Sequence, residues 1–182
     1  MTEASDIKSR TIALVGLMGV GKSSVGRRLA MALDMPFRDA DVEIETAAGR
    51  SVTDIFAELG EAEFRAGEHR VIRRILEGPP VVLATGGGAF MHEGTRTLLL
   101  ASAVTVWLKA DLEVLAERAT RRDTRPLLRG KDPVEVLSRL AEARYPTYAL
   151  ADIEVMTGEG AHRDAVRAVI AALKDHYARS AA

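Results

Sequence analysis

The chain has 182 residues, of which 47% are hydrophobic and 28% charged, a size and balance that suit one folded domain rather than two domains or a disordered chain. Its formal net charge of -1 excludes a general attraction to nucleic acid or an anionic membrane, and the absence of cysteine excludes disulfides and thiolate metal sites. Residues 1–10 are polar, and no apolar run approaches the ~20 residues that span a bilayer, so we expect a cytoplasmic protein with no membrane partner.

Short apolar runs alternate along the chain with segments of helical spacing. The first run, Thr11–Val15, is rich in β-branched residues and is followed by glycine, which is typical of a strand buried on both faces. Further strands are expected at Pro36–Arg38, Pro80–Ala84, Ala103–Leu108 and Ile153–Val155. The alternation predicts an α/β fold, a five-stranded parallel sheet flanked by helices, with ligands at the carboxyl ends of the strands.

Capping residues mark several of the intervening helices. Ser51 is a good N-cap for a helix over Val52–Leu59, which Gly60 would end, and Asp132 followed by Pro133 starts another. Residues 120–131 contain four arginines and are expected to form an exposed basic loop. Residues 161–182 have the spacing of an amphipathic helix that packs on the sheet.

The segment Gly16-Leu17-Met18-Gly19-Val20-Gly21-Lys22-Ser23 matches the P-loop pattern G-x-x-x-x-G-K-[ST] between a predicted strand and a predicted helix. Its backbone N–H groups would form an anion nest at a helix N-terminus, where the helix dipole favours phosphate. Lys22 would reach the β and γ phosphates of ATP, and the Ser23 hydroxyl would bind Mg²⁺. The nucleotide-binding set is Gly19, Val20, Gly21, Lys22, Ser23 and Ser24. The alternative is a glycine-rich turn with a surface lysine.

Two carboxylates follow the expected second strand. In a strand with a two-residue repeat, Asp39 and Asp41 would face the same side and require a cation between them. Asp39 is therefore expected to support the Mg²⁺ shell, and Asp41 to accept a hydrogen bond from the substrate hydroxyl. The alternative for Asp41 is a solvated N-cap of a helix over Val42–Ala47.

Other candidate groups also lie near the carboxyl edge of the sheet. Gly86, Gly87 and Gly88 follow a strand and would expose backbone N–H groups, although a plain flexible turn explains them equally well. Arg65 and Arg144 lie on predicted helices, where each could bind a carboxylate in a bidentate way or be merely solvated.

Taken together, these segments resemble the shikimate kinase family over roughly Thr11 to Thr157. The matching stretches are GLMGVGKS, FRDADVEIE, GRSVTDIFAELGEAEFR, ATGGGAF, RPLL and ARYPTY. The resemblance implies a P-loop kinase fold and transfer of the γ-phosphoryl group of ATP to the 3-hydroxyl of shikimate, with Mg²⁺ as cofactor, in aromatic amino-acid biosynthesis.

The resemblance also implies roles for individual residues. It makes Asp41, Arg65, Gly87, Gly88 and Arg144 contacts of shikimate, with both arginines on its carboxylate. It places Arg125 in a mobile lid, at about residues 120–131, that closes over ATP, and Arg118 against adenine. Lys22, Asp41 and Arg125 would then be the catalytic residues, and residues 39–68 the acceptor-binding region of a single domain over residues 1–182. A monomer is expected.

Two positions depart from common patterns. Ser24 stands where the family often has threonine, which keeps the hydroxyl. The stretch VVLATGGGA lacks the acidic residue that ends the metal-supporting strand of many P-loop proteins, an absence that the family shares and that moves the metal role toward Asp39.

Two other functions remain open at this point. One is a compact P-loop kinase for gluconate or a nucleoside monophosphate, although the paired arginines favour a carboxylated polyol. The other is a nucleotide-dependent switch or silent binding module, which would not need arginines on both the acceptor side and the lid.

Overall fold

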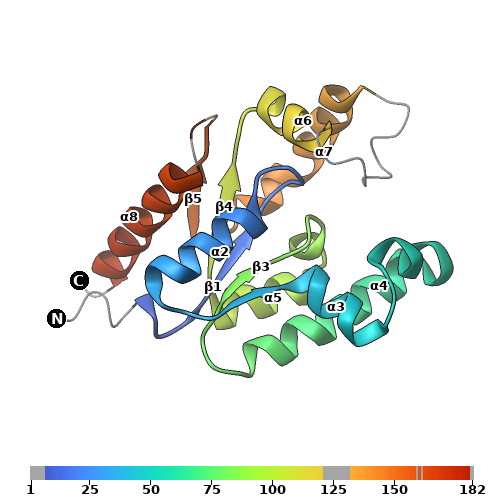
Figure 1. Cartoon of the computed structure of the whole chain (residues 1–182), viewed down its shortest axis with the longest axis horizontal. Helices are drawn as coiled ribbons and strands as arrows, with labels where there is room; N and C mark the ends of the chain where they lie inside the picture. The colour runs from blue at the N-terminus through green and yellow to red at the C-terminus, as the bar shows by residue number, and fades with distance from the viewer. Residues whose placement is uncertain (1–6, 121–131, 159, 161, 181–182) are drawn as a thin grey trace.

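A computed structural model describes residues 7–120, 132–158, 160 and 162–180. Its centre is one parallel sheet of five strands in the order β2-β3-β1-β4-β5 (Figure 1). The strands are β1 (Thr11–Val15), β2 (Phe37–Asp39), β3 (Val82–Ala84), β4 (Ala103–Lys109) and β5 (Ile153–Met156). In the register, Leu14 of β1 pairs with both Ala84 of β3 and Val106 of β4, so their carboxyl ends lie at one edge. All five strands lie within one residue or two of the positions that the sequence predicts.

Helices cover the sheet and carry the connections between strands. Figure 1 shows α2 (Lys22–Leu33) and α8 (His162–Ser180) side by side in front of the strands, with α5 (Glu93–Ser102) behind them. The predicted C-terminal helix is thus confirmed, and Val169 and Leu173 of α8 are fully buried. Helices α6 (Leu112–Thr120) and α7 (Pro133–Tyr148) lie beyond the carboxyl end of β4. Asp132 caps α7 through the Val134 N–H, as predicted.

A helical arm extends from the sheet near its β2 edge. It consists of α3 (Ala40–Ala48) and the first part of α4 (Val52–Leu76), which project to the right in Figure 1. The arm has a small apolar cluster of its own, formed by Ile44, Ile55 and Phe64, separate from the core on the sheet. Such satellite clusters give an element cohesion without tying it firmly to the main core.

Two helix predictions need correction. Gly60 interrupts α4 with φ 79° and ψ 173°, but helix resumes at once and continues to Leu76, so Gly60 makes a kink rather than an end. The sequence pattern predicts no helix over 93–102, where α5 lies. Its N-cap is His92, whose ring accepts the Thr95 N–H, and histidine is not among the residues that usually mark a helix start. No helix among the described residues is long and apolar enough to cross a membrane.

Candidate active site

The P-loop lies between β1 and α2, as predicted, and backbone carbonyl groups of the loop hold its lysine in place. Lys22 is buried, and its Nζ donates to the carbonyl oxygens of Gly16 at 2.7 Å and Leu17 at 3.0 Å. Gly21 precedes α2 with φ 95°, a left-handed conformation that glycine adopts without strain. The loop therefore presents a helix N-terminus and one ammonium group at the same point, which suits a phosphate chain.

Ser23 and Asp39 meet at the carboxyl edge of the sheet. The Ser23 hydroxyl donates to Asp39 Oδ2 at 2.5 Å, and Asp39 Oδ1 accepts the backbone N–H of Asp41 at 3.1 Å. A hydroxyl and a carboxylate are hard oxygen donors of the kind that Mg²⁺ uses with substrate phosphates and water, so this pair fits that ion. Within the described residues, no group of three or more His, Cys, Asp or Glu could hold a metal by itself.

The structure corrects the reason for which Asp39 and Asp41 lie close together. Strand β2 ends at Asp39, and Asp41 lies in the first turn of α3, so strand alternation does not apply to the pair. Asp39, not Asp41, is the N-cap of α3, and its side chain draws the Asp41 N–H inward. The alternative in which Asp41 is the N-cap is therefore wrong.

Asp41 has an unfavourable setting for its charge. The residue as a whole is exposed, but its Oδ1 lies in a crowded place, 3.0 Å from where a β-carbon on Gly86 would stand. Partial burial of the carboxyl group, and then the Asp39 carboxylate, raise the pKa of Asp41, against the opposing charges of Lys22 and Arg65. A raised pKa favours a carboxyl group that can take a proton from a bound hydroxyl.

Arg65 projects from α4 toward Gly86, Gly87 and Gly88 after β3, the glycine loop, and is held by neighbours on its own helix. Its Nη1 donates to Glu68 Oε2 at 2.6 Å, and its Nε lies 3.6 Å from Glu61 Oε1. Its guanidinium also packs over the rings of Phe56 and Phe64. Glu68 is fully buried, its Oε1 has no hydrogen-bond partner among the described residues, and burial raises the pKa of its carboxyl group. The pair presents a fixed cation beside a carboxylate oxygen that no described residue contacts by a hydrogen bond.

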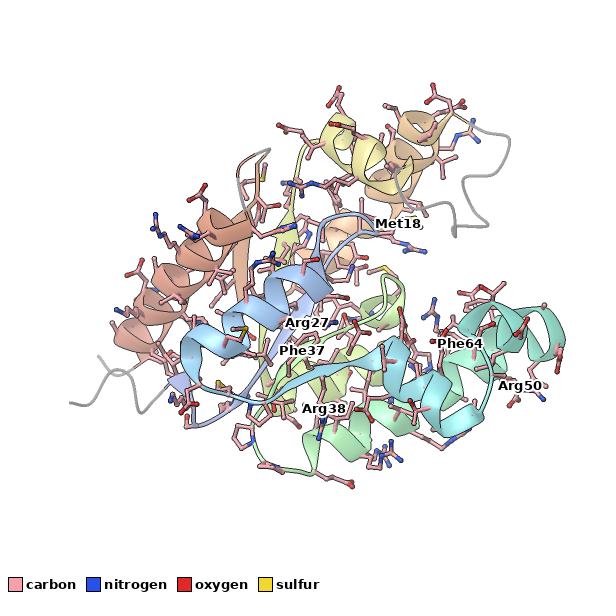
Figure 2. All side chains as sticks on the ribbon, viewed as in Figure 1. Met18, Arg27, Phe37, Arg38, Arg50 and Phe64 are labelled. Carbon is pink, nitrogen blue, oxygen red and sulfur yellow. The ribbon has the colours of Figure 1, made fainter. Side chains whose placement is uncertain are left out.

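The glycine loop joins the P-loop side to the arm. A β-carbon on Gly88 would stand 2.7 Å from Arg65 Cζ, and one on Gly86 would stand 2.8 Å from Glu68 Oε1, so these side chains need glycine there. A β-carbon on Gly87 would lie 3.6 Å from the Met18 nitrogen of the P-loop. Figure 2 shows this loop between Met18 on the P-loop and Phe64 on α4.

Two side chains of α7 hold the carbonyl group of Gly87. Arg144 Nη1 donates to that oxygen at 3.1 Å, and the hydroxyl of Tyr148 donates to it as well. Tyr148 is fully buried, and burial raises its pKa to about 12, so the phenol keeps its proton across the physiological range. These two hydrogen bonds fix the carbonyl oxygen, so the glycine loop is not a plain flexible turn.

The outer part of the phosphate site is formed by the P-loop, α6 and the start of α8. Arg118 Nη2 donates to the Gly158 carbonyl at 2.7 Å. Together with Val20 and His162, these residues line a small cavity directly beside the P-loop. Ser24 follows Ser23 in the first turn of α2, and its backbone carbonyl accepts a hydrogen bond from Arg28. Arg125 and residues 121–131 lie outside the described residues.

The site thus brings together Lys22, Ser23, Asp39, Asp41, Arg65, the glycine loop and Arg144. Sequence reasoning missed Glu68 and Tyr148. Glu68 stands among Glu61, Glu63 and Arg65, a charge pattern typical of a solvated helix face, and nothing local marks it as buried. Tyr148 lies in the stretch ARYPTY, four residues from Arg144, the helical spacing that brings both side chains to Gly87.

Comparison with known proteins decides the family. A family model described as shikimate kinase matches residues 18–174. A shikimate kinase of Caulobacter vibrioides is 61% identical over 176 residues, which cover 97% of this chain and 88% of that protein.

The chain belongs to the shikimate kinase family.

Other relatives agree with this assignment. A shikimate kinase of Zymomonas mobilis is 55% identical over 164 residues, 90% of this chain and 93% of that protein. The solved structure of the shikimate kinase of Acinetobacter baumannii in complex with shikimate superposes with a TM-score of 0.85 at 36% identity, covering 92% of this chain and 94% of that one. The P-loop kinase fold expected from the resemblance is therefore confirmed for this family member.

Proposed function

We propose that this shikimate kinase family member transfers the γ-phosphoryl group of ATP to the 3-hydroxyl of shikimate. The observation that carries the proposal is the position of the glycine loop. Gly87 lies against Met18 of the P-loop, and Gly88 lies against Arg65 of the acceptor side. A substrate held by Arg65, Arg144 and the loop amides would therefore lie next to the phosphate cradle, which is the proximity that phosphoryl transfer needs.

Each half of the site has a stated role in this proposal. The P-loop amides from Gly19 to Ser24 bind the phosphates, and Lys22 exchanges the Gly16 and Leu17 carbonyls for phosphate oxygens. Arg118 packs on adenine at the outer cavity. Ser23 and Asp39 would hold Mg²⁺, and the bound ion would supply positive charge beside the phosphates. Arg125, in the lid, supplies further positive charge.

On the acceptor side, Asp41 orients the 3-hydroxyl group and accepts its proton late in the transfer. Arg65 and Arg144 bind the shikimate carboxylate, because a planar guanidinium matches a carboxylate in two hydrogen bonds. Glu68 holds Arg65 in place, and Tyr148 holds the Gly87 carbonyl group. Nucleic-acid and membrane partners form no part of the proposal, and the proposed enzyme is a monomer.

The test is a panel of acceptors. The purified chain with MgATP is assayed for ADP release with shikimate, quinate and gluconate, and phosphorus NMR identifies the product. We expect turnover with shikimate at least ~100-fold above that with gluconate, which offers neither the ring nor the same placement of its carboxylate. ADP release that is independent of every acceptor would mean that the chain is an ATPase or a nucleotide switch and would refute the proposal.

A further inference from the structure

Behind the acceptor site, one buried hydroxyl group lies between two imidazole rings from different elements. Thr95 Oγ1 of α5 is 3.1 Å from His69 Nδ1 of α4 and 3.0 Å from His92 Nδ1. Arg73 Nη2, also of α4, lies 3.0 Å from His69 Nε2. Thr95 is fully buried, whereas the two rings are half-buried. None of these groups has a role in the proposed function.

The hydrogen atoms in this cluster can be placed by elimination. The backbone N–H of Thr95 donates to His92 Nδ1 at 3.2 Å, so that nitrogen has a lone pair and no proton. The Thr95 hydroxyl then donates its single proton to His92 and must accept from His69. His69 Nδ1 therefore has the proton, and its Nε2 accepts from Arg73. A continuous series of hydrogen bonds therefore runs from Arg73 through His69 and Thr95 to His92, each group donating to the next.

Packing around the rings supports this arrangement. The ring centroids of His69 and His92 are 5.8 Å apart. A β-carbon on Gly94 would stand 3.3 Å from His92 Cε1, which is a tight contact, and 3.7 Å from His69 Cε1, which is an ordinary one, so Gly94 packs against both rings. A buried hydroxyl with both of its hydrogen-bonding roles used contributes to stability, and it is costly to leave without partners.

The cluster joins the two elements that carry the acceptor groups. His69 directly follows Glu68, the residue that holds Arg65. His92 directly follows the short helix η1 (Ala89–Met91), which begins after Gly88. The Thr95 hydroxyl thus connects the helix of Arg65 to the chain that leaves the glycine loop.

We propose that Thr95, with His69 and His92, is a positioning residue for the acceptor substrate, which keeps Arg65 at the spacing from the glycine loop that a bound carboxylate requires. This inference rests on the proposed function. Thr95 touches no substrate in this scheme and acts through the relative placement of α4 and the loop.

This series of hydrogen bonds requires both imidazole rings to be neutral. Protonation of His69 at Nε2 would set an N–H against the Arg73 guanidinium, and protonation of His92 at Nδ1 would remove the acceptor of both Thr95 groups. Burial, and then the neighbouring Arg73 guanidinium and His92 ring, lower the pKa of His69 below its ordinary value of 6.5. Two charged groups on neighbouring elements have other partners. Arg96 of α5 donates to carbonyls of η1, and Glu43 of α3 lies 3.7 Å from Arg74.

The sign of the pH effect follows from these contacts. Because the pKa of His69 is lowered, its ring is neutral above pH 6.5 and the hydrogen bonds between α4 and the chain after the glycine loop are intact there. They are lost as the pH falls from 6.5 through the pKa of His69. The KM for shikimate should therefore rise on the acid side, while the KM for ATP should not.

The test compares Thr95→Val, which has nearly the same shape but no hydroxyl, with Thr95→Ser, which keeps it. Both are made in the full chain, with Thr97→Val on the exposed face of α5 as the matched control. At pH 7.5 we expect Thr95→Val to raise the KM for shikimate about 5- to 10-fold, the ratio that corresponds to one hydrogen bond, with kcat and the KM for ATP within about twofold of wild type. Thr95→Ser and Thr97→Val should resemble wild type.

A second measurement follows the KM for shikimate from pH 7.5 to pH 5.5. The wild-type value should rise toward that of Thr95→Val, whose own value stays nearly constant, while any acid-side loss of kcat through Asp41 is common to both. An unchanged KM in Thr95→Val, or a rise for both substrates that serine does not restore, would overturn the inference and leave shikimate turnover standing. A wild-type protein that does not phosphorylate shikimate would refute the proposed function instead, and this inference with it.

Discussion

In the proposed mechanism, the carboxyl group of Asp41 serves catalysis at the expense of stability. Because its pKa is raised above 3.8, the ionised form is less stable in the folded protein than in the unfolded chain. This cost is absent below pH 3.8 and is complete once the pH exceeds the raised pKa. Asp41→Asn removes the charge and keeps the shape, so the variant without ligands should melt at a higher temperature than wild type at pH 7, and the difference should shrink toward pH 4.

The same variant should lose activity. Its kcat with shikimate should fall about 100- to 10,000-fold, the usual contribution of a positioned general base. Thermal melts by circular dichroism and steady-state kinetics check the two halves, with the exposed Asp175→Asn as the control. A variant that is less stable at pH 7 would contradict the electrostatic argument, and one with wild-type turnover would remove Asp41 from the mechanism.

Gly88 tests the placement of Arg65 by steric means alone. Its φ is -104°, which any residue adopts, so Gly88→Ala adds no backbone strain and only brings a methyl group onto the Arg65 guanidinium. Displacing one charged contact should raise the KM for shikimate about 10- to 100-fold. The KM for ATP should change little. Gly67→Ala is the control, because the nearest described side-chain atom to its β-carbon, Arg70 Nη2, would lie 3.8 Å away. Equal effects of the two substitutions on shikimate kinetics would show that Arg65 is not held there.

At the residue scale, the sequence predicted groups whose chemistry depends on local pattern and missed those whose role depends on burial. The P-loop pattern fixes where Lys22 and Ser23 lie, because a glycine-rich turn between strand and helix has one geometry. The proximity of Asp39 and Asp41 was predicted for the wrong reason, since β2 is too short to include both. Glu68 could not be predicted, because only tertiary packing distinguishes a buried glutamate from the solvated ones on the same helix.

Gly60 makes the kink that lets α4 serve both the arm and the sheet. With φ 79° and ψ 173°, its backbone lies in a region that is essentially restricted to glycine. Gly60→Ala should therefore destabilise the protein by about 1–3 kcal/mol or straighten α4, which would move Arg65. Urea unfolding and the KM for shikimate measure the two results. Gly67→Ala, in the regular part of the helix, should instead stabilise by about 0.5–1 kcal/mol. A Gly60 variant as stable as Gly67→Ala would show that the kink is not enforced by backbone strain.

The strands were predictable and one helix was not, for a physical reason. A parallel strand buried on both faces must be a continuous apolar run, and the sequence of β1 or β4 has no other good interpretation. Helix α5 begins with an imidazole cap, and its most important polar contact is with His69, 26 residues earlier in the chain. Contacts of that kind leave no local pattern.

At the scale of the whole molecule, α8 connects the C-terminal region to the nucleotide side. It packs on α2, which begins at the P-loop, and on β5. Leu173 is fully buried in this contact, so Leu173→Ala should lower the free energy of unfolding by about 2–5 kcal/mol through lost burial and a cavity. Urea denaturation checks this, with the adjacent exposed Lys174→Ala as control. If both variants unfolded at the same urea concentration, α8 would be no part of the cooperative core.

The two apolar clusters predict different responses to the two substrates. Ile44, Ile55 and Phe64 pack with each other and not with the main core, so the arm from Ala40 to Phe64 should open at a lower free energy than β1. Shikimate would bridge the arm, through Asp41 and Arg65, to the glycine loop, which the core side holds through Arg144 and Tyr148.

Hydrogen exchange measured by mass spectrometry on the free chain, with ADP and with shikimate separates these responses. We expect fast exchange in peptides of residues 40–64, marked slowing of that exchange by shikimate, and little slowing by ADP alone. Peptides of β1 should stay protected throughout. Slowing of the arm by ADP to the same extent as by shikimate would mean that the arm closes with the nucleotide, and that the acceptor does not itself join the two clusters.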